Sequence, residues 1–285
     1  MTPESVWGKR LGDSIRLLRT NPLVAVGLVV VIVWVATGIF AVQLAPRDPL
    51  KQNVVDRLQA PNETYPFGSD ELGRDVFSRV IYGARITIPA GVVVIVVGSL
   101  IGVLVGAVAG YVGGVWDEVL MRVTELFMAF PTIILALAIT AALGPDIRNA
   151  IVALVIVWWP NYARLIRGLV LEVKSQDYVE GARSVGATGV YILFRTVLPN
   201  CISPALVLAT LDIGNAILTF AGLSFLGLGP DPSSPEWGRM VSIGIDFFDQ
   251  WWMWLYPGLA IAILVMAFNF VGDGLRDVFD PRTRK

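Results

Sequence analysis

Long uncharged apolar runs alternate with shorter polar stretches along this chain of 285 residues. A bilayer core about 30 Å thick is crossed by a helix of roughly 20 apolar residues. Four runs that approach or exceed this length carry no charge at all: 23–42, 86–110, 126–143 and 251–272. Two further candidates are weaker because they contain charged residues: 150–171 contains Arg164 and Arg167, and 202–228 contains Asp212. We accept both because a long arginine near a helix end can extend its charge to the interface.

This pattern predicts an all-α integral membrane protein with six transmembrane helices. The first run is longer than the apolar region of a signal peptide, about 7–15 residues, so we expect a retained first helix. Pro131 predicts a kink in the third span, 126–143. Three polar stretches remain between the spans, at about 46–85, 172–196 and 229–250.

Composition supports lipid as the solvent of this chain. Apolar residues make up 55%, charged residues only 16%, and the mean hydropathy is +0.68, whereas soluble domains have about 25% charged residues. Cys201 is the only cysteine and histidine is absent, which excludes an internal disulfide and argues against a Cys/His metal site. A net charge of -1 gives no reason to expect nucleic-acid binding.

The distribution of cations favours one orientation. Six spans place both termini on one side of the membrane. If that side is the cytoplasm, 14 of the 22 Lys and Arg residues lie inside, as the positive-inside rule requires. The segment 46–85 holds six of the other eight and is the exception.

Four glycines in the second span recur every four residues. Side chains spaced by four lie on one helix face, and missing side chains there let another backbone approach closely. Gly98, Gly102, Gly106 and Gly110 therefore predict close helix packing, and they indicate no particular solute.

Three polar residues in the fifth span share one helix face. Asp212, Asn215 and Thr219 stand at i, i+3 and i+7. A carboxylate is costly in hydrocarbon, so this face should contact protein or a water-filled cavity. Two interpretations stay open: a pathway lining that contacts solute, or a structural hydrogen bond to a neighbouring helix.

The polar loop 172–196 predicts one short helix. Asp177 is suited to cap it, Glu180 would lie in the first turn, where a negative charge is favourable, and Gly186 would end it. Such a helix is too short to be stable alone in water. Docking in a partner's groove would explain it, and a solvated loop is the alternative. The apolar face of this helix is formed by Tyr178, Ala182 and Val185.

The same loop resembles the cytoplasmic "EAA" signature of ABC importer permeases. That signature is matched by Glu180-Gly181-Ala182, then Gly186, then Val197-Leu198-Pro199. Gly181 replaces the usual first alanine and should loosen the helix by about 1 kcal/mol.

The remaining chain resembles one branch of these permeases, the "C" subunit of dipeptide, oligopeptide and nickel importers. Its external signature is matched by residues 67–85, and a second motif by 223–229 followed by 235–238. Residues 16–22 and 45–49 match the amino-terminal extension of the branch. One departure is Phe220, where relatives often carry glutamate.

The resemblance covers residues 14–282 and implies a transmembrane domain of the type I ABC importer class. It divides the chain into an amino-terminal tail, first helix and external segment (1–83), a permease core with its coupling loop 172–196 (84–276), and a tail (277–285). It implies a bacterial inner-membrane location with both termini cytoplasmic. The implied ATPase-coupling residues are Asp177, Tyr178, Glu180, Gly181, Ala182, Val185, Gly186, Leu198 and Pro199.

The implied partners are a homologous "B" permease, two ATPase domains, an external substrate-binding lipoprotein and membrane lipids. The sequence has no Gly-x-x-x-x-Gly-Lys-Ser/Thr loop, so ATP and Mg²⁺ should bind the ATPase partners, and this chain is expected to hold no cofactor or metal and to catalyse no reaction. The expected activity is import of di- or oligopeptides.

Two kinds of alternative remain open. The same importer class also carries nickel chelates, glutathione or haem. From another class, an ion-coupled secondary transporter or a channel could use Asp212 as an ion site. An intramembrane enzyme is disfavoured because the chain lacks both histidine and a paired-carboxylate motif within a span.

Overall fold

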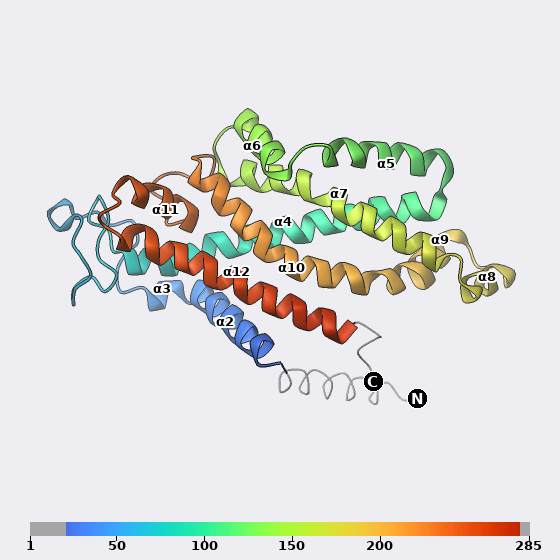
Figure 1. Ribbon diagram of the computed structural model, residues 1–285, viewed down its shortest axis with the longest axis horizontal. Helices are drawn as coiled ribbons and strands as arrows, with labels where there is room; N and C mark the ends of the chain where they lie inside the picture. The colour runs from blue at the N-terminus through green and yellow to red at the C-terminus, as the bar shows by residue number, and fades with distance from the viewer. Residues whose placement is uncertain (1–20, 280–285) are drawn as a thin grey trace.

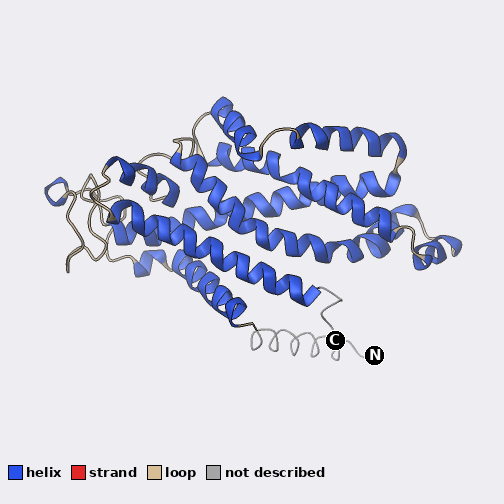
Figure 2. Ribbon diagram, in the orientation of Figure 1, coloured by secondary structure: helices blue, strands red, loops and turns tan. Residues whose placement is uncertain are grey.

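The computed structural model describes residues 21–279, and within that range helices and loops account for the chain apart from an isolated β-bridge between Ser69 and Asp75 (Figure 2). Residues 1–20 and 280–285, with their cations, lie outside the described residues, whereas residues 277–279 of the expected carboxy-terminal tail belong to the last helix. The first half contains α2 (Pro22–Ile39), α3 (Ala41–Leu44), the 3₁₀ turn η1 (Val54–Asp56), α4 (Val76–Val112), α5 (Gly114–Met128) and α6 (Thr132–Leu143). The second half contains α7 (Ile147–Val173), α8 (Asp177–Ser184), α9 (Gly189–Tyr191), the π-helical segment η2 (Ile192–Val197), α10 (Leu198–Phe225), α11 (Trp237–Asp246) and α12 (Trp252–Phe279).

Five helical segments are long and apolar enough to cross a membrane: α2, α4, α7, α12 and the continuous run from α9 through η2 to α10. A sixth crossing is supplied by α5 and α6 if this bent pair counts as one span. The prediction of an all-α membrane protein is therefore confirmed, with five candidate spans among the described residues, or six when the bent pair is counted as one.

The third span differs from the prediction of one kinked helix over 126–143. The structure has two helices, α5 and α6, bent by 88° at a short break. Pro131 is the N-cap of α6 with an extended backbone (φ -56, ψ 128). A proline also disfavours the helical conformation of the residue before it, here Phe130. The two restrictions together end α5 instead of bending it.

The second span starts ten residues earlier than its uncharged run. α4 begins at Val76, where the Asp75 carboxylate accepts a hydrogen bond from the Ser78 amide (2.9 Å) and caps the helix. The expected domain boundary at 83/84 thus falls inside α4. The charged residues Arg79 and Arg85 precede the uncharged run, which begins at position 86, and they belong to the first turns of this helix.

The helices form an elongated bundle with distinct ends (Figure 1). The loops 45–75 and α11 lie at one end, and α8 lies at the other. Buried apolar side chains form three clusters along the bundle: one among α4, α11 and α12 near the loops, one among α4, α7 and α10 in the middle, and one among α7, α8, η2 and α10 near α8.

Candidate functional site

The short helix α8 lies beyond the end of the bundle, between α7 and α10 (Figure 1). Its end is well defined. Gly186 has φ +82, a conformation that favours glycine, its amide donates to the Arg183 carbonyl (2.9 Å), and the Ala187 amide donates to the Ala182 carbonyl (3.2 Å). This pair of bonds is the Schellman arrangement, so Gly186 ends the helix as its sequence position predicted.

The start of α8 corrects one detail. Asp177 is the first helical residue and not the cap, because Gln176 has an extended backbone and its carbonyl accepts from the amides of Val179 (2.9 Å) and Glu180 (3.3 Å). The Gln176 side chain makes no capping bond. Asp177 and Glu180 both lie in the first turn, where their charges interact favourably with the helix dipole.

One side of α8 is anchored and the other is open. Val179 is fully buried in the cluster with Ile166 and Ile192. Tyr178 is 50% exposed and Val185 is 84% exposed. Sequence reasoning did not identify Val179 as the residue that anchors α8 to the bundle. The available signal was a single apolar residue next to Tyr178.

The other expected coupling residues divide between the exposed surface and the bundle. Ala182 is half-buried against the cluster, and Leu198 is buried at the start of α10. The exposed members are Asp177, Glu180, Gly181, Gly186 and Pro199. The structure thus presents the predicted apolar face of α8, except for Ala182, on the outer surface of the chain.

The four glycines of α4 lie against α7. A Cβ added at Gly102 would lie 2.9 Å from the Ala163 amide nitrogen, and one at Gly106 would lie 3.0 Å from the Arg167 nitrogen. At Gly110 it would lie 2.9 Å from the Arg167 carbonyl oxygen, whereas Gly98 has more room, 3.3 Å from the Trp158 Cβ. The two backbones are therefore in direct contact along this seam.

Polar contacts extend the seam toward α8. The Lys174 ammonium donates to the Gly110 carbonyl (2.7 Å), which joins the end of α7 to α4. The Arg167 guanidinium makes a bidentate pair with Asp117 (2.5 and 2.7 Å), which joins α7 to α5. The segment that precedes α8 is thus bonded to two other helices.

Asp212 has a partner on a neighbouring helix. The hydroxyl of Tyr162, a fully buried residue of α7, donates to the Asp212 carboxylate (2.9 Å). The Thr219 hydroxyl donates to the Asn215 carbonyl of its own helix (2.8 Å), and Asn215 is exposed. The structural hydrogen bond is present, while an exposed Asn215 one turn away leaves the pathway role of this face as a prediction. Phe220 is fully buried in the middle cluster.

At the opposite end, the motifs matched by resemblance meet around one arginine. Arg79 is 1% exposed and donates to three backbone carbonyls: Pro49 (3.0 Å), Ser233 (3.1 Å) and Ser234 (3.1 Å). These carbonyls belong to segments that are far apart in sequence. Arg79 therefore joins the loop 45–75 to the loop before α11, and nothing in the sequence marked its partners.

Two tryptophans complete this assembly. The indole of Trp237 donates to the Val80 carbonyl (2.9 Å), and the indole of Trp252 donates to the Ser69 carbonyl (3.0 Å). We call this assembly, residues 45–75 with 229–236, the loop cap. It is tied to α4, α11 and α12 by buried side chains.

Two carboxylates of the loop cap, Glu236 and Glu71, are fully or partly removed from solvent. Glu236 caps α11 by accepting from the amides of Gly238 (2.9 Å) and Arg239 (2.8 Å), and it accepts from the Thr87 hydroxyl (3.2 Å). Its complete burial raises the pKa of this carboxyl above the usual value. Burial likewise raises the pKa of Glu71, although Arg74 lies beside it (2.7 Å).

The described residues contain no cluster of three or more His, Cys, Asp or Glu side chains that could hold a metal ion. The candidate site therefore consists of α8 and the helices to which it is anchored.

Comparisons with known proteins identify the relatives of this chain. Residues 102–285 match the model of the family "binding-protein-dependent transport system inner membrane component", and residues 9–61 match the "N-terminal TM domain of oligopeptide transport permease C". A dipeptide transport system permease protein, DppC, of Alkalihalophilus pseudofirmus is 38% identical over 95% of this chain and 90% of its own length. A glutathione transport system permease protein, GsiD, of Escherichia coli O6:K15:H31 is 42% identical over 94% of this chain and 89% of its own length.

Among solved structures, an inward-facing conformation of the MetNI methionine ABC transporter matches with a TM-score of 0.58. It is 23% identical and covers 72% of this chain and 98% of the matched chain, a likeness that shows the fold alone.

Proposed function

The chain belongs to the family of binding-protein-dependent transport system inner membrane components, and on that premise we propose that it is a permease subunit of an ATP-driven importer of di- and oligopeptides. It is a multi-pass membrane protein of the ABC importer class, and the expected resemblance is confirmed. The dipeptide and glutathione transport permeases among its relatives support short peptides or similar small solutes as the cargo.

The observation that carries the coupling part of this proposal is the exposed face of α8. Tyr178 and Val185 have large exposed apolar surfaces, although Val179 fixes the same helix to the bundle. An apolar helix face held firmly at the end of a bundle fits the groove of a partner protein. We assign that partner to an ATPase domain. Closure of the ATPases would move α8, and α8 would carry α7 and α10 with it as rigid bodies.

The rest of the assembly follows the same proposal. A homologous "B" permease would complete the cavity, a second ATPase domain would serve that permease, and an external binding lipoprotein would deliver the solute. ATP and Mg²⁺ would bind the ATPases; the absence of a phosphate-binding loop from this sequence supports that division. In this orientation α8 and both termini face the cytoplasm of a bacterium and the loop cap faces outward.

Charge reversal at Glu180 tests this proposal. Glu180 is exposed on α8, so Glu180→Lys should leave the bundle intact but place a cation in the first helical turn and in the docked interface. We expect a loss of solute-stimulated ATPase activity in the complex purified with its partners. Glu63→Lys, the same charge reversal at an exposed residue of the loop cap, is the matched control.

Undiminished stimulation in Glu180→Lys would contradict the coupling role. A cysteine at position 185 gives a second measurement, because it should crosslink to the ATPase and not to lipid. Uptake that survives dissipation of the proton gradient but requires ATP would separate this mechanism from an ion-coupled transporter.

A further inference from the structure

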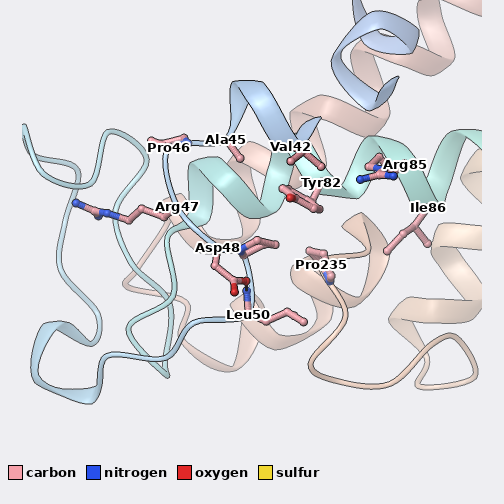
Figure 3. Close-up of a pocket in the computed structure, with 11 residues that line it drawn as sticks. Val42, Ala45, Pro46, Arg47, Asp48, Leu50, Tyr82, Arg85, Ile86 and Pro235 are labelled. Atoms are coloured by element: carbon pink, nitrogen blue, oxygen red, sulfur yellow. Dashed lines mark hydrogen bonds between the residues drawn. The ribbon is translucent and has the colours of Figure 1, made fainter. Parts of the chain in front are cut away.

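Two adjoining hollows meet at Arg85, near the loop cap. The first has a volume of about 730 Å³ and lies among α3, the loop 45–50, α4 and Pro235 (Figure 3). The second has a volume of about 390 Å³ and lies between α2 and α4. Arg85 lines both, so a ligand could occupy the two hollows at once.

Arg85 is placed at the boundary between water and hydrocarbon. It is the last charged residue before the uncharged run 86–110, and its side chain is exposed. Its guanidinium lies 5.8 Å from the ring centre of Tyr82, which lines the first hollow. Among the described residues no carboxylate forms an ion pair with it. An unpaired guanidinium is suited to a phosphate, which it can bind with two parallel hydrogen bonds.

The first hollow also offers a negative charge. Asp48 lies on the other side of Tyr82 from Arg85 (Figure 3). One oxygen of Asp48 accepts from the Leu50 amide (2.8 Å), and the other has no cation beside it in the described part of the chain. Arg47 also lines this hollow, but its guanidinium lies 4.1 Å from the Tyr65 ring centre and points away from Tyr82 (Figure 3). Arg85 and Asp48 are therefore the cation and the anion that face the same occupant.

The second hollow is an apolar groove between two candidate membrane spans. It is lined by Val35, Gly38 and Ile39 of α2 and by Ala84, Ile88 and Pro89 of α4, with Arg85 at its polar end. A Cβ added at Gly38 would lie 3.4 Å from the Ala84 backbone, so the two helices cross closely there.

We propose that these hollows bind one phospholipid with a primary amine in its headgroup, of the phosphatidylethanolamine type, in the leaflet on the side of the loop cap. Its phosphate binds Arg85, its ammonium binds Asp48, and an acyl chain lies in the groove between α2 and α4. Opposite charges on the two residues match a zwitterionic headgroup better than an anionic one. The proposal does not depend on the cargo or on the ATPase partner.

Lipid binding to the purified full-length chain tests this site. Native mass spectrometry would compare phosphatidylethanolamine, phosphatidylcholine and phosphatidylglycerol added to the protein in detergent. We expect the first to bind most tightly. Arg85→Gln should weaken its binding by about tenfold, the value of one charge-assisted hydrogen bond. Asp48→Asn, which keeps the acceptor for Leu50, should remove the preference over phosphatidylcholine. Arg57→Gln, an exposed cation outside both hollows, should change nothing.

Filling the groove gives an independent measurement. Val35→Trp should reduce phosphatidylethanolamine binding without altering either charge, because the indole occupies the space of the acyl chain. Equal binding of all three lipids, or an Arg85→Gln variant that binds like the parent, overturns the proposal. A preference for phosphatidylglycerol would overturn the role of Asp48 and with it the assigned headgroup.

Discussion

Alanine at Gly106 provides the sharpest test of the seam between α4 and α7. The added Cβ would press against the Ala163 carbonyl oxygen and would lie 3.0 Å from both the Ala163 carbonyl carbon and the Arg167 nitrogen. All three are backbone atoms, so no side-chain rotation can relieve the contact. One helix must move away from the other along its whole length.

The expected cost follows from that geometry. Overpacking by a single methyl group typically costs about 1–3 kcal/mol. Gly106→Ala should fall within this range because its contacts are backbone atoms. Gly98→Ala should cost less, since its nearest neighbour is the Trp158 Cβ at 3.3 Å and the next atoms lie 3.7 Å or more away.

Gly168→Ala is the matched control, because a Cβ added to this exposed residue of α7 meets nothing within 4 Å. It should stabilise the helix by about 0.5–1 kcal/mol. Unfolding free energies from titration with a denaturing detergent, followed by tryptophan fluorescence, would rank the three variants. If Gly106→Ala unfolds like Gly168→Ala, the seam is not a direct backbone contact and the reasoning fails.

Two further predictions concern carboxylates, the half-buried Asp212 and the fully buried Glu236. Asp212→Leu removes the acceptor of the Tyr162 hydroxyl and should destabilise the chain by about 1–3 kcal/mol. Asp212→Asn keeps an acceptor, so altered solute uptake by this variant in an intact complex would indicate a pathway role. Unchanged uptake would mean that Asp212 has only the structural role. Because burial raises the pKa of Glu236, the folded state binds its proton more tightly than the unfolded state. The unfolding free energy of the parent, relative to Glu236→Gln, should therefore fall as pH rises from the ordinary value near 4.5 through the raised pKa; a difference that rises over this range would contradict the burial effect.

The membrane spans could be predicted because hydrocarbon leaves few choices. A charge-free run of the required length has to be helical, since every backbone polar group must be satisfied within the segment. The glycine repeat likewise predicted a close helix contact, although not that α7 would be the partner. The end of α8 followed from Gly186, whose φ of +82 suits glycine.

Contacts between distant segments could not be predicted in this way. The bond from Tyr162 to Asp212 and the carbonyls bound by Arg79 depend on how helices pack, and one sequence carries no signal for that packing. The break at Pro131 was underestimated because a proline can either bend or end a helix, and the surroundings decide which. Val179 was overlooked because α8 is too short for its periodicity to be read with certainty.

The length of α4 has a mechanical consequence. Its 37 residues extend about 55 Å, well beyond a hydrocarbon core of about 30 Å. At one end of this helix Arg79 binds the loop cap through hydrogen bonds. At the other end the Gly110 carbonyl accepts a hydrogen bond from Lys174, three residues before α8 begins. Pro89 lies inside this helix, between the two attachments, and has no amide hydrogen to donate to the preceding turn, so a tilt at one face of the membrane reaches the opposite face only through that position.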